Sequence, residues 1–383
     1  MRLCLFLLLI VSAFCPSGFG QKRAIFPANA PKPVGPYSPG VIAGNYLYVA
    51  GQGVRRPDGK QSDTFEAQAR QCLENIRAIV KAGGLSMRDV VYTQAHVLEE
   101  SQIPVVERLY REYFPEAPPA RSTVRVRLMP TATPVEINAV AYRGKRTPVR
   151  VAGYDEPGWQ TPAIAAGDRI YLSGASGTDV KQAVASLRKT LERAGADLHR
   201  VALLHVYRTP EVSEQAIVEG LKSAWTGRAL PALAFAEILS LPAGAKLQIT
   251  GIDARPQANL ELLGAITGVP ARCATIESAA FCSTQNGKSD GTLAAAVEQQ
   301  VSATFQNIAE ALSLANLKVD DVVAATVYLD DLDEFQRMNQ VYATQFEAGR
   351  PARTTLQPAP KLSSRQSASG PVPVVAITVV AER

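Results

Sequence analysis

The sequence predicts an α+β protein made of three tandem copies of one unit with the element order β-β-α-β-α-β-β. The prediction rests on the length of 383 residues, on motifs that recur at a constant interval, and on alternating strand-like and helix-like periodicity within each interval. A chain of this length suits two or three domains.

The repeats appear as two motifs that share one offset. Pro-Ala-Arg-Ser-Thr at residues 119–123 returns as Pro-Ala-Arg-Thr-Thr at 351–355, which is 232 residues later. Leu-Glu-Asn-Ile at 73–76 returns at the same offset as Phe-Gln-Asn-Ile at 305–308. A degenerate middle copy aligns at an offset of 112, with Pro-Ala-Leu at 231–233. We expect domains at 21–145, 155–255 and 265–383, joined by linkers near 143–157 and 255–268.

The first half of copy one reads as a hairpin followed by a helix. Strands 41–43 and 46–50 flank Gly44 and Asn45, a pair favoured at two-residue turns. Residues 65–82 carry apolar positions at helical spacing, and two glycines follow them.

The second half predicts a strand at 90–97, a helix at about 104–114 and two further strands at 122–128 and 135–142. We expect the last two strands to pair with each other across the turn at 130–134. In copy three this connection is longer and serine-rich between 361 and 370, which suits a surface loop.

The N-terminus is typical of a signal peptide. Arg2 precedes a largely apolar stretch at 3–14, and Gly18 and Gly20 are small residues before a cleavage site after Gly20. A stretch of twelve residues is too short for a membrane span, which needs about 20, and bulky Phe14 disfavours lipoprotein processing at the next residue. We expect a periplasmic or secreted protein without membrane attachment.

Charge and histidine content exclude several function classes. The net charge of +5 is spread along the chain, so no nucleic-acid partner is expected. The three histidines, His96, His199 and His205, form no cluster, and no Cys-x-x-Cys spacing occurs. We expect neither a metal nor a cofactor.

Two cysteines face each other in the predicted hairpin of copy three. A two-residue turn at Glu277 and Ser278 pairs Cys273 with Cys282 in a position without backbone hydrogen bonds, with Cα atoms about 4.5 Å apart. A disulfide is therefore expected in an oxidising compartment, although two small core residues would give the same pattern. Cys72 lies on the apolar stripe of a helix and is expected to be a buried free thiol.

Several motifs together resemble the RidA family, which is also called YjgF or L-PSP. The resemblance implies a fold similar to chorismate mutase of the bacillus type, with a sheet-lined barrel inside and helices outside. Family members are usually homotrimers, so a three-copy chain implies a single-chain pseudo-trimer, monomeric in solution. The matching segments are Gly-Pro-Tyr-Ser at 35–38, Gly-Gln at 51–52, Pro-Ala-Arg-Ser at 119–122, Glu-Ile at 136–137, Ser-Thr-Gln at 283–285, Met-Asn-Gln-Val-Tyr at 338–342 and Pro-Ala-Arg at 351–353.

The resemblance implies hydrolysis of small reactive enamines or imines, such as 2-aminoacrylate, to a 2-keto acid and ammonia. The expected ligand is a small carboxylate. Two alternatives remain open: a carboxylate-binding protein without turnover, and an L-PSP-type endoribonuclease, for which the sequence offers neither a basic groove nor a histidine pair.

The resemblance also assigns roles to individual residues. Glu136, Arg353 and Tyr37 take catalytic roles, with the arginine fork holding the substrate carboxylate. Substrate-binding roles fall to Asn339, Arg121 and Ser283. No copy has the full set, since the arginine is Leu233 in copy two, the glutamate is Gln248 and Ala376 in copies two and three, and in copy one the serine is Ala50 and the asparagine is Glu107.

A working site is expected to combine two copies. If the last two strands pair, Arg121 and Glu136 lie roughly 20 Å apart at about 3.3 Å per residue. A closed ring then allows two directions: Glu136 meets Arg353 and Asn339, or it meets Leu233. We favour the first, because it explains why copy one keeps the glutamate and copy three the asparagine.

Overall fold

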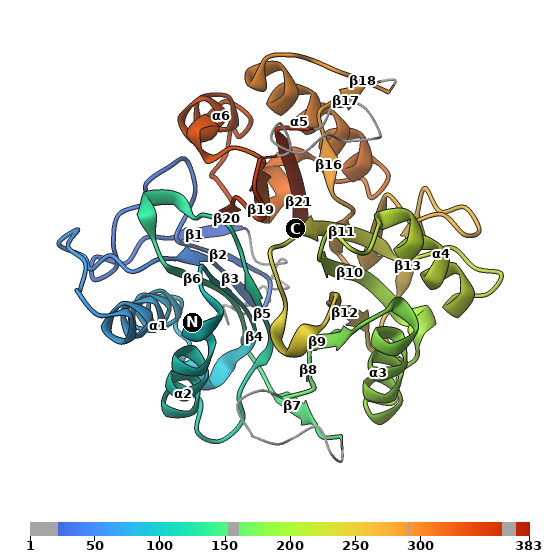
Figure 1. Ribbon diagram of the computed structural model, residues 1–383, viewed down its shortest axis with the longest axis horizontal. Helices are drawn as coiled ribbons and strands as arrows, with labels where there is room; N and C mark the ends of the chain where they lie inside the picture. The colour runs from blue at the N-terminus through green and yellow to red at the C-terminus, as the bar shows by residue number, and fades with distance from the viewer. Residues whose placement is uncertain (1–21, 152–160, 290, 362–372) are drawn as a thin grey trace, which may run out of the picture.

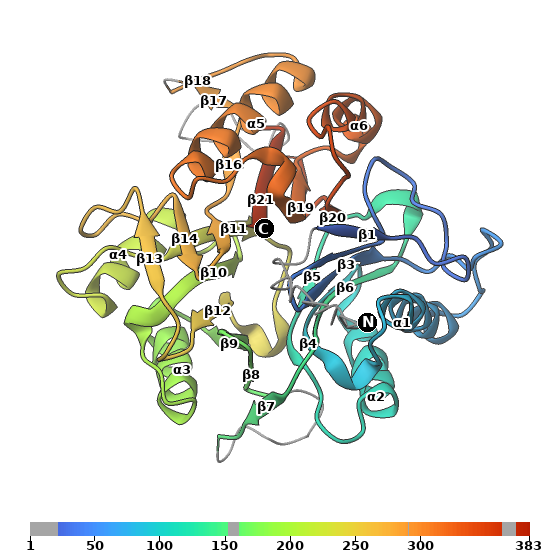
Figure 2. The ribbon, with the colours of Figure 1, turned by 180° about the vertical axis from the view of Figure 1, so that it is seen from behind.

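The structure is a computed structural model that describes residues 22–151, 161–289, 291–361 and 373–383. The predicted signal peptide, and the serine-rich segment beyond residue 361, lie outside these ranges. The chain forms three similar mixed sheets that surround a common centre, with the helices on the outside (Figures 1 and 2).

Copy one contains a six-stranded sheet in the order β1-β2-β3-β6-β4-β5, in which only β4 and β5 run parallel. Its elements are β1 (Arg23–Ile25), β2 (Gly40–Ala43), β3 (Tyr46–Gln52), α1 (Phe65–Ala82), β4 (Val90–Val97), α2 (Ile103–Tyr113), β5 (Ala120–Arg125) and β6 (Val135–Tyr142).

Copy two repeats this sheet in the order β7-β8-β9-β12-β10-β11. Its elements are β7 (Arg146–Val149), β8 (Ala163–Ala166), β9 (Arg169–Gly177), α3 (Val180–Arg193), β10 (Val201–Arg208), α4 (Glu214–Ala224), β11 (Ala232–Glu237) and β12 (Leu247–Ala254).

Copy three has the order β13-β14-β15-β21-β19-β20, with β16 also paired to β21 and a separate β17–β18 ribbon. Its elements are β13 (Leu260–Leu263), β14 (Cys273–Ile276), β15 (Ala279–Cys282), β16 (Gln285–Asn286), β17 (Lys288–Ser289), β18 (Thr292–Leu293), α5 (Val297–Ser313), β19 (Val322–Leu329), α6 (Phe335–Ala343), β20 (Ala352–Leu356) and β21 (Val375–Glu382).

Local sequence explains the element ends. Thr64 caps α1 by accepting a hydrogen bond from the Ala67 N–H (3.4 Å), and Gly83 ends the same helix. The turn between β2 and β3 places Gly44 at φ 52°, a left-handed conformation that glycine adopts without steric cost, and Gly167 repeats it at φ 60° in copy two.

The expected pairing of the last two strands of each copy is wrong. In copy one, β4 lies between β5 and β6, parallel to the former and antiparallel to the latter. The connection at 130–134 therefore crosses over β4 instead of forming a hairpin. The 20 Å estimate for Arg121 and Glu136 was built on that hairpin and is not supported.

The two expected linkers each contain an edge strand. β7 pairs with β8 and β13 pairs with β14, so both segments extend the sheet of the following copy, as β1 does in copy one. Each link between copies thereby becomes part of a sheet.

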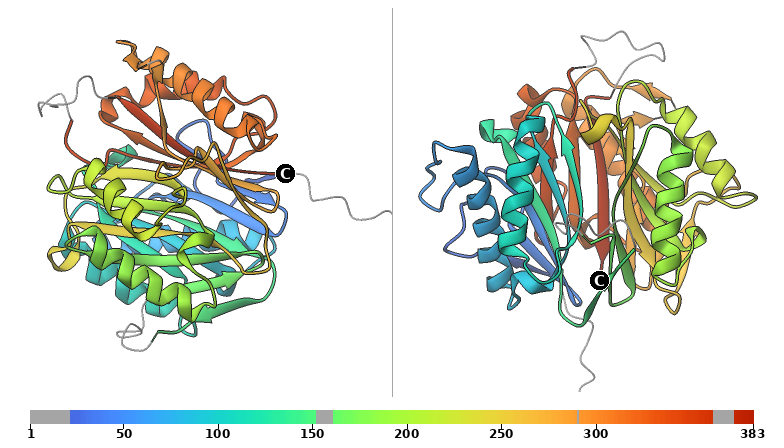
Figure 3. Two further views of the ribbon diagram at one scale, coloured as in Figure 1. Left: turned by 90° about the vertical axis from the view of Figure 1, so that its right-hand side faces the viewer. Right: turned by 60° about the horizontal axis from the view of Figure 1, so that its bottom comes forward.

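Two kinds of core stabilise the ring. On the outer faces, each sheet packs against its own helices around Leu73, Leu187 and Phe305. On the inner faces, two clusters join buried residues of all three copies, and the larger one includes Tyr48 and Tyr171. The strands thus line the middle of the molecule and the helices cover it (Figure 3). Among the described helices, none is both long and apolar enough to cross a membrane.

Candidate active site

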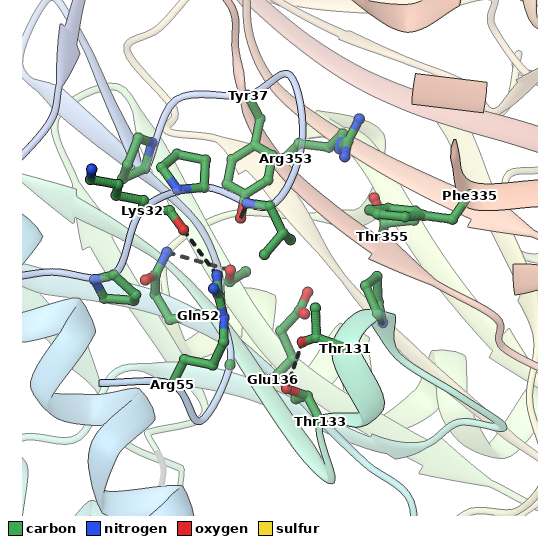
Figure 4. Close-up of a pocket in the computed structure, with 17 residues that line it drawn as sticks. Lys32, Tyr37, Gln52, Arg55, Thr131, Thr133, Glu136, Phe335, Arg353 and Thr355 are labelled. Carbon is green, nitrogen blue, oxygen red and sulfur yellow. Dashed lines mark hydrogen bonds between the residues drawn. The ribbon is translucent and has the colours of Figure 1, made fainter. Parts of the chain in front are cut away.

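A small pocket of about 40 Å³ lies at the interface between copies one and three (Figure 4). Copy one supplies the loop before β2, the end of β3 and the start of β6, and copy three supplies α6 and β20. The polar, charged and aromatic side chains that line it are Lys32, Tyr37, Gln52, Arg55, Thr131, Thr133, Glu136, Phe335, Arg353 and Thr355.

Glu136 forms the copy-one wall of this pocket. Its side chain is buried and lies directly over Gly51, where an added β-carbon would come within 2.0 Å of Glu136 Oε1. Burial raises the pKa of Glu136 to about 8, an effect that Arg353 and the backbone of Thr355 oppose in part. The carboxyl group is therefore mostly protonated at neutral pH and can donate a proton.

Arg353 forms the opposite wall. Its guanidinium carbon lies over the rings of Tyr342, Tyr37 and Phe335, at 4.7, 5.2 and 5.6 Å from their centroids. The side chain is 3% exposed, and within the described residues no carboxylate oxygen lies within 4 Å of it. A buried guanidinium without a counter-ion is costly, and its planar fork matches a carboxylate. The pocket is therefore suited to an anionic ligand.

Tyr37 and Asn339 complete the surroundings of Arg353. The copy-one loop that carries Tyr37 packs closely on Arg353 and Asn339, because a β-carbon at Gly35 would lie 2.6 Å from Arg353 Nη2 and 3.2 Å from the Asn339 amide atoms. Burial, followed by the charge of Glu136, raises the pKa of Tyr37. The Asn339 amide is buried behind the pocket wall, and neither of its polar atoms finds a hydrogen-bond partner in the part of the chain that the structure describes.

A family model described as "Endoribonuclease L-PSP" matches residues 27–143 and 271–364, more than half of the chain. The chain belongs to this family, RidA/YjgF/L-PSP. The two matched ranges fall in copies one and three.

The similar family members are about as long as one copy. A RutC family protein of Pyrococcus horikoshii is 40% identical over 125 residues, and the 2-iminobutanoate/2-iminopropanoate deaminase of Escherichia coli is 38% identical over 127 residues. Each match covers 32% of this chain and 99% of the relative. The crystal structure of the E. coli YjgF gene product is 38% identical, with the same two coverages and a TM-score of 0.31.

The predicted site residue Arg121 lies elsewhere, at the interface between copies one and two. Its backbone N–H donates to Ser173 Oγ in β9 (2.8 Å). Gln248, which replaces the family glutamate in copy two, donates from Nε2 to Ser176 Oγ in the same strand (3.0 Å). This interface therefore combines the arginine of copy one with the glutamate position of copy two.

Ser283 lies at the third interface, between copies two and three. Its hydroxyl donates to the Ala271 carbonyl (2.7 Å) and accepts the Leu233 N–H (2.9 Å). The Leu233 carbonyl accepts the Thr284 N–H (3.0 Å), and Ala376 lies nearby on β21, paired with β16. Neither the arginine nor the glutamate of the family is present here.

The ring thus runs in the direction that brings Glu136 to Arg353. Of the six residues predicted for the site, the structure gathers Glu136, Arg353, Tyr37 and Asn339 and leaves the other two at separate interfaces. In the described part of the chain, no cluster of three or more histidine, cysteine, aspartate or glutamate side chains is placed to hold a metal ion.

Sequence reasoning missed several lining residues. Arg55 donates to the Lys32 carbonyl (2.9 Å), which brings two cationic side chains to the pocket. Thr133 packs against Gly53, at 2.8 Å from the position of an added β-carbon, and was interpreted only as part of a turn. Phe335 reaches the pocket from the start of α6. Only the folding of these loops brings the residues together, so no local pattern could have identified them.

Proposed function

We propose that the pocket between copies one and three hydrolyses small imines or enamines that carry a carboxylate, giving a 2-keto acid and ammonia. The observation that carries this proposal is the buried Arg353 guanidinium, without a carboxylate partner in the described residues, beside a Glu136 carboxyl group that is protonated at neutral pH. The similarity to an E. coli imine deaminase supports it.

Each residue has a distinct task in the proposed reaction. Arg353 binds the substrate carboxylate, and Tyr37 and the surrounding rings exclude water from that contact. Glu136 donates its proton to the imine nitrogen, so that water adds to the more electrophilic carbon. The Glu136 carboxylate then takes a proton from the added water. Collapse of the resulting amino alcohol forms the ketone and releases ammonia.

Binding without turnover is the second candidate, because Ala50 stands at the position of the family serine in this interface. An RNA-cleaving role lacks comparable support, since neither His96 nor His205 lines the pocket.

We also propose that the chain is exported and works as a monomer. The N-terminal sequence pattern and the Cys273–Cys282 disulfide support export, because disulfides persist in oxidising compartments. Fusion of three copies supports a monomer, since one chain supplies all three interfaces.

Steady-state kinetics test the proposed activity on 2-iminobutanoate, generated in the cuvette by an amino-acid oxidase and corrected for spontaneous hydrolysis. Arg353→Ala is expected to lower kcat/KM about 10- to 150-fold, because it removes a charged hydrogen-bond donor worth about 1.5–3 kcal/mol. Glu136→Gln is expected to lower kcat about 10²- to 10⁴-fold, the usual contribution of general acid–base catalysis, and to retain binding of 2-oxobutanoate.

Leu233→Met is the matched control at the equivalent position of copy two. Leu233 is buried in the core of that copy, so the volume-conserving change is used in place of alanine. Equal activity of the wild type, Arg353→Ala and Leu233→Met proteins would exclude the proposed site. Binding of 2-oxobutanoate by a wild type that never accelerates hydrolysis would favour the second candidate.

A further inference from the structure

Two arginines of this chain stack on tyrosines at equivalent helix positions. The guanidinium of Arg121 lies 4.6 Å from the ring centroid of Tyr110 on α2, and that of Arg353 lies 4.7 Å from Tyr342 on α6. Both side chains are buried, with exposed fractions of 1% and 3%. The two positions therefore form an internal comparison within one molecule.

One charged residue distinguishes the helices that face the two arginines. Three positions before the tyrosine, α2 carries Glu107 and α6 carries Asn339. Glu107 Oε1 lies 3.4 Å from Arg121 Nη2. The corresponding Asn339 amide is neutral and leaves the guanidinium of Arg353 without a carboxylate among the described residues.

The copy-two side of this interface also resembles the copy-one side of the open pocket. A β-carbon at Gly174 would lie 2.4 Å from the Gln248 side chain, as one at Gly51 would lie 2.0 Å from Glu136. Gln248 is buried, and its Oε1 finds no hydrogen-bond partner within the described ranges. The interface between copies two and three differs at all three positions. The arginine is replaced by Leu233, the glycine by Thr284 and the glutamate by Ala376.

We propose that the interface between copies one and two is a second site for small carboxylates, occupied by the chain's own Glu107. Because Glu107 is attached to the same chain, its carboxylate has a high effective concentration at the buried arginine. It therefore competes with any free carboxylate for that arginine. The chain therefore binds one small carboxylate, at Arg353, although it carries two arginines built for that purpose. This inference rests on the proposed function only in taking the Arg353 pocket as the open site.

Isothermal titration calorimetry with 2-oxobutanoate tests the inference through stoichiometry. The wild type is expected to bind one molecule per chain. Glu107→Asn, which copies the residue of α6, is expected to bind two, and Glu107→Gln serves as a second variant if the first one folds poorly. Asn339→Glu, which copies the residue of α2, is expected to bind none. The double variant Glu107→Asn/Asn339→Glu is expected to bind one again, at Arg121.

The outcomes separate this inference from the proposed function. Two molecules bound by the wild type, or an unchanged number in folded Glu107→Asn and Glu107→Gln proteins, would overturn the internal-carboxylate inference. A gain of one site in these variants supports it even if the wild type fails to hydrolyse the imine. Adding Arg121→Ala to Glu107→Asn is expected to remove the gained site, and persistence of that site would place it elsewhere and overturn the inference.

Discussion

Burial keeps two of the described carboxyl groups protonated near neutral pH, in different surroundings. Burial raises the pKa of both Glu136 and Asp253 to about 8. Glu136 faces a pocket and a guanidinium. Asp253 is fully buried in the copy-two sheet at a position where the other copies have Ala141 and Ala381, and neither of its oxygens finds a hydrogen-bond partner of good geometry within the described ranges. The first arrangement suits proton transfer, and the second costs stability.

The proposed proton donation by Glu136 predicts a pH profile. The protonated form of the free enzyme exists below a pKa of about 8, so kcat/KM is expected to fall about tenfold per pH unit above that value. The measurement is the initial rate of imine hydrolysis at substrate concentrations below KM, between pH 6 and 10. Because Glu136→Gln cannot titrate, its residual rate should lack this limb. A wild-type rate that rises through pH 8 would mean that the carboxylate, acting as a base, limits the reaction.

Asp253 predicts a pH-dependent stability. Its pKa is about 8 in the folded state and about 3.9 when unfolded, so between these values the folded state retains a proton that the unfolded state has lost. Stability therefore falls as pH rises, by about 1.4 kcal/mol per pH unit for each such group.

Urea unfolding at pH 5, 6 and 7 measures this slope. Asp253→Ala is expected to remove about 1.4 kcal/mol per pH unit from it, and Glu136→Gln should remove a similar amount. An unchanged slope in Asp253→Ala would show that this carboxyl group is ionised in the folded protein.

At the scale of elements, the sequence predicted the strand pairs whose register is fixed by a short turn. The two-residue turn between β14 and β15 determines the register, and Cys273 pairs with Cys282 as expected. The disulfide is present, with Cα atoms 3.9 Å apart against the expected 4.5 Å, and Cys72 is a buried free thiol. The nine-residue connection between β5 and β6 fixes no register, so the position of β4 between them could not be derived locally.

The same elements predict a thiol count. Protein that begins at Gln21, denatured without reductant, should show one free thiol, Cys72, because the other two cysteines are bonded. Reduction before denaturation should give three and serves as the control. Three free thiols without reductant would mean that the protein folds without the bridge.

At the scale of the whole molecule, buried polar contacts join all three copies. Arg169 of copy two donates to Tyr48 Oη of copy one (2.6 Å) and to Glu382 of copy three (2.9 Å), and Tyr48 donates to the same carboxylate (2.6 Å). Each partner is more than 100 residues away in sequence, so no local pattern indicates the network. Removing one member of a buried ion pair typically costs about 3–5 kcal/mol of folding stability. Loss of Arg169 or Glu382 is therefore expected to destabilise the packing of the three copies.

Fusion of three copies changes how the pocket between copies one and three depends on concentration. The chain connects copy one to copy two and copy two to copy three, and noncovalent contacts alone hold copy one against copy three. In a homotrimer, pockets shared between subunits disappear on dilution, since assembly depends on protomer concentration. Here Glu136 and Arg353 belong to one chain, so pocket formation is intramolecular.

Specific activity is therefore expected to stay constant over a thousand-fold dilution, and sedimentation should show one compact monomer. Activity that falls with dilution, or an elongated particle, would show that the pocket forms between different chains.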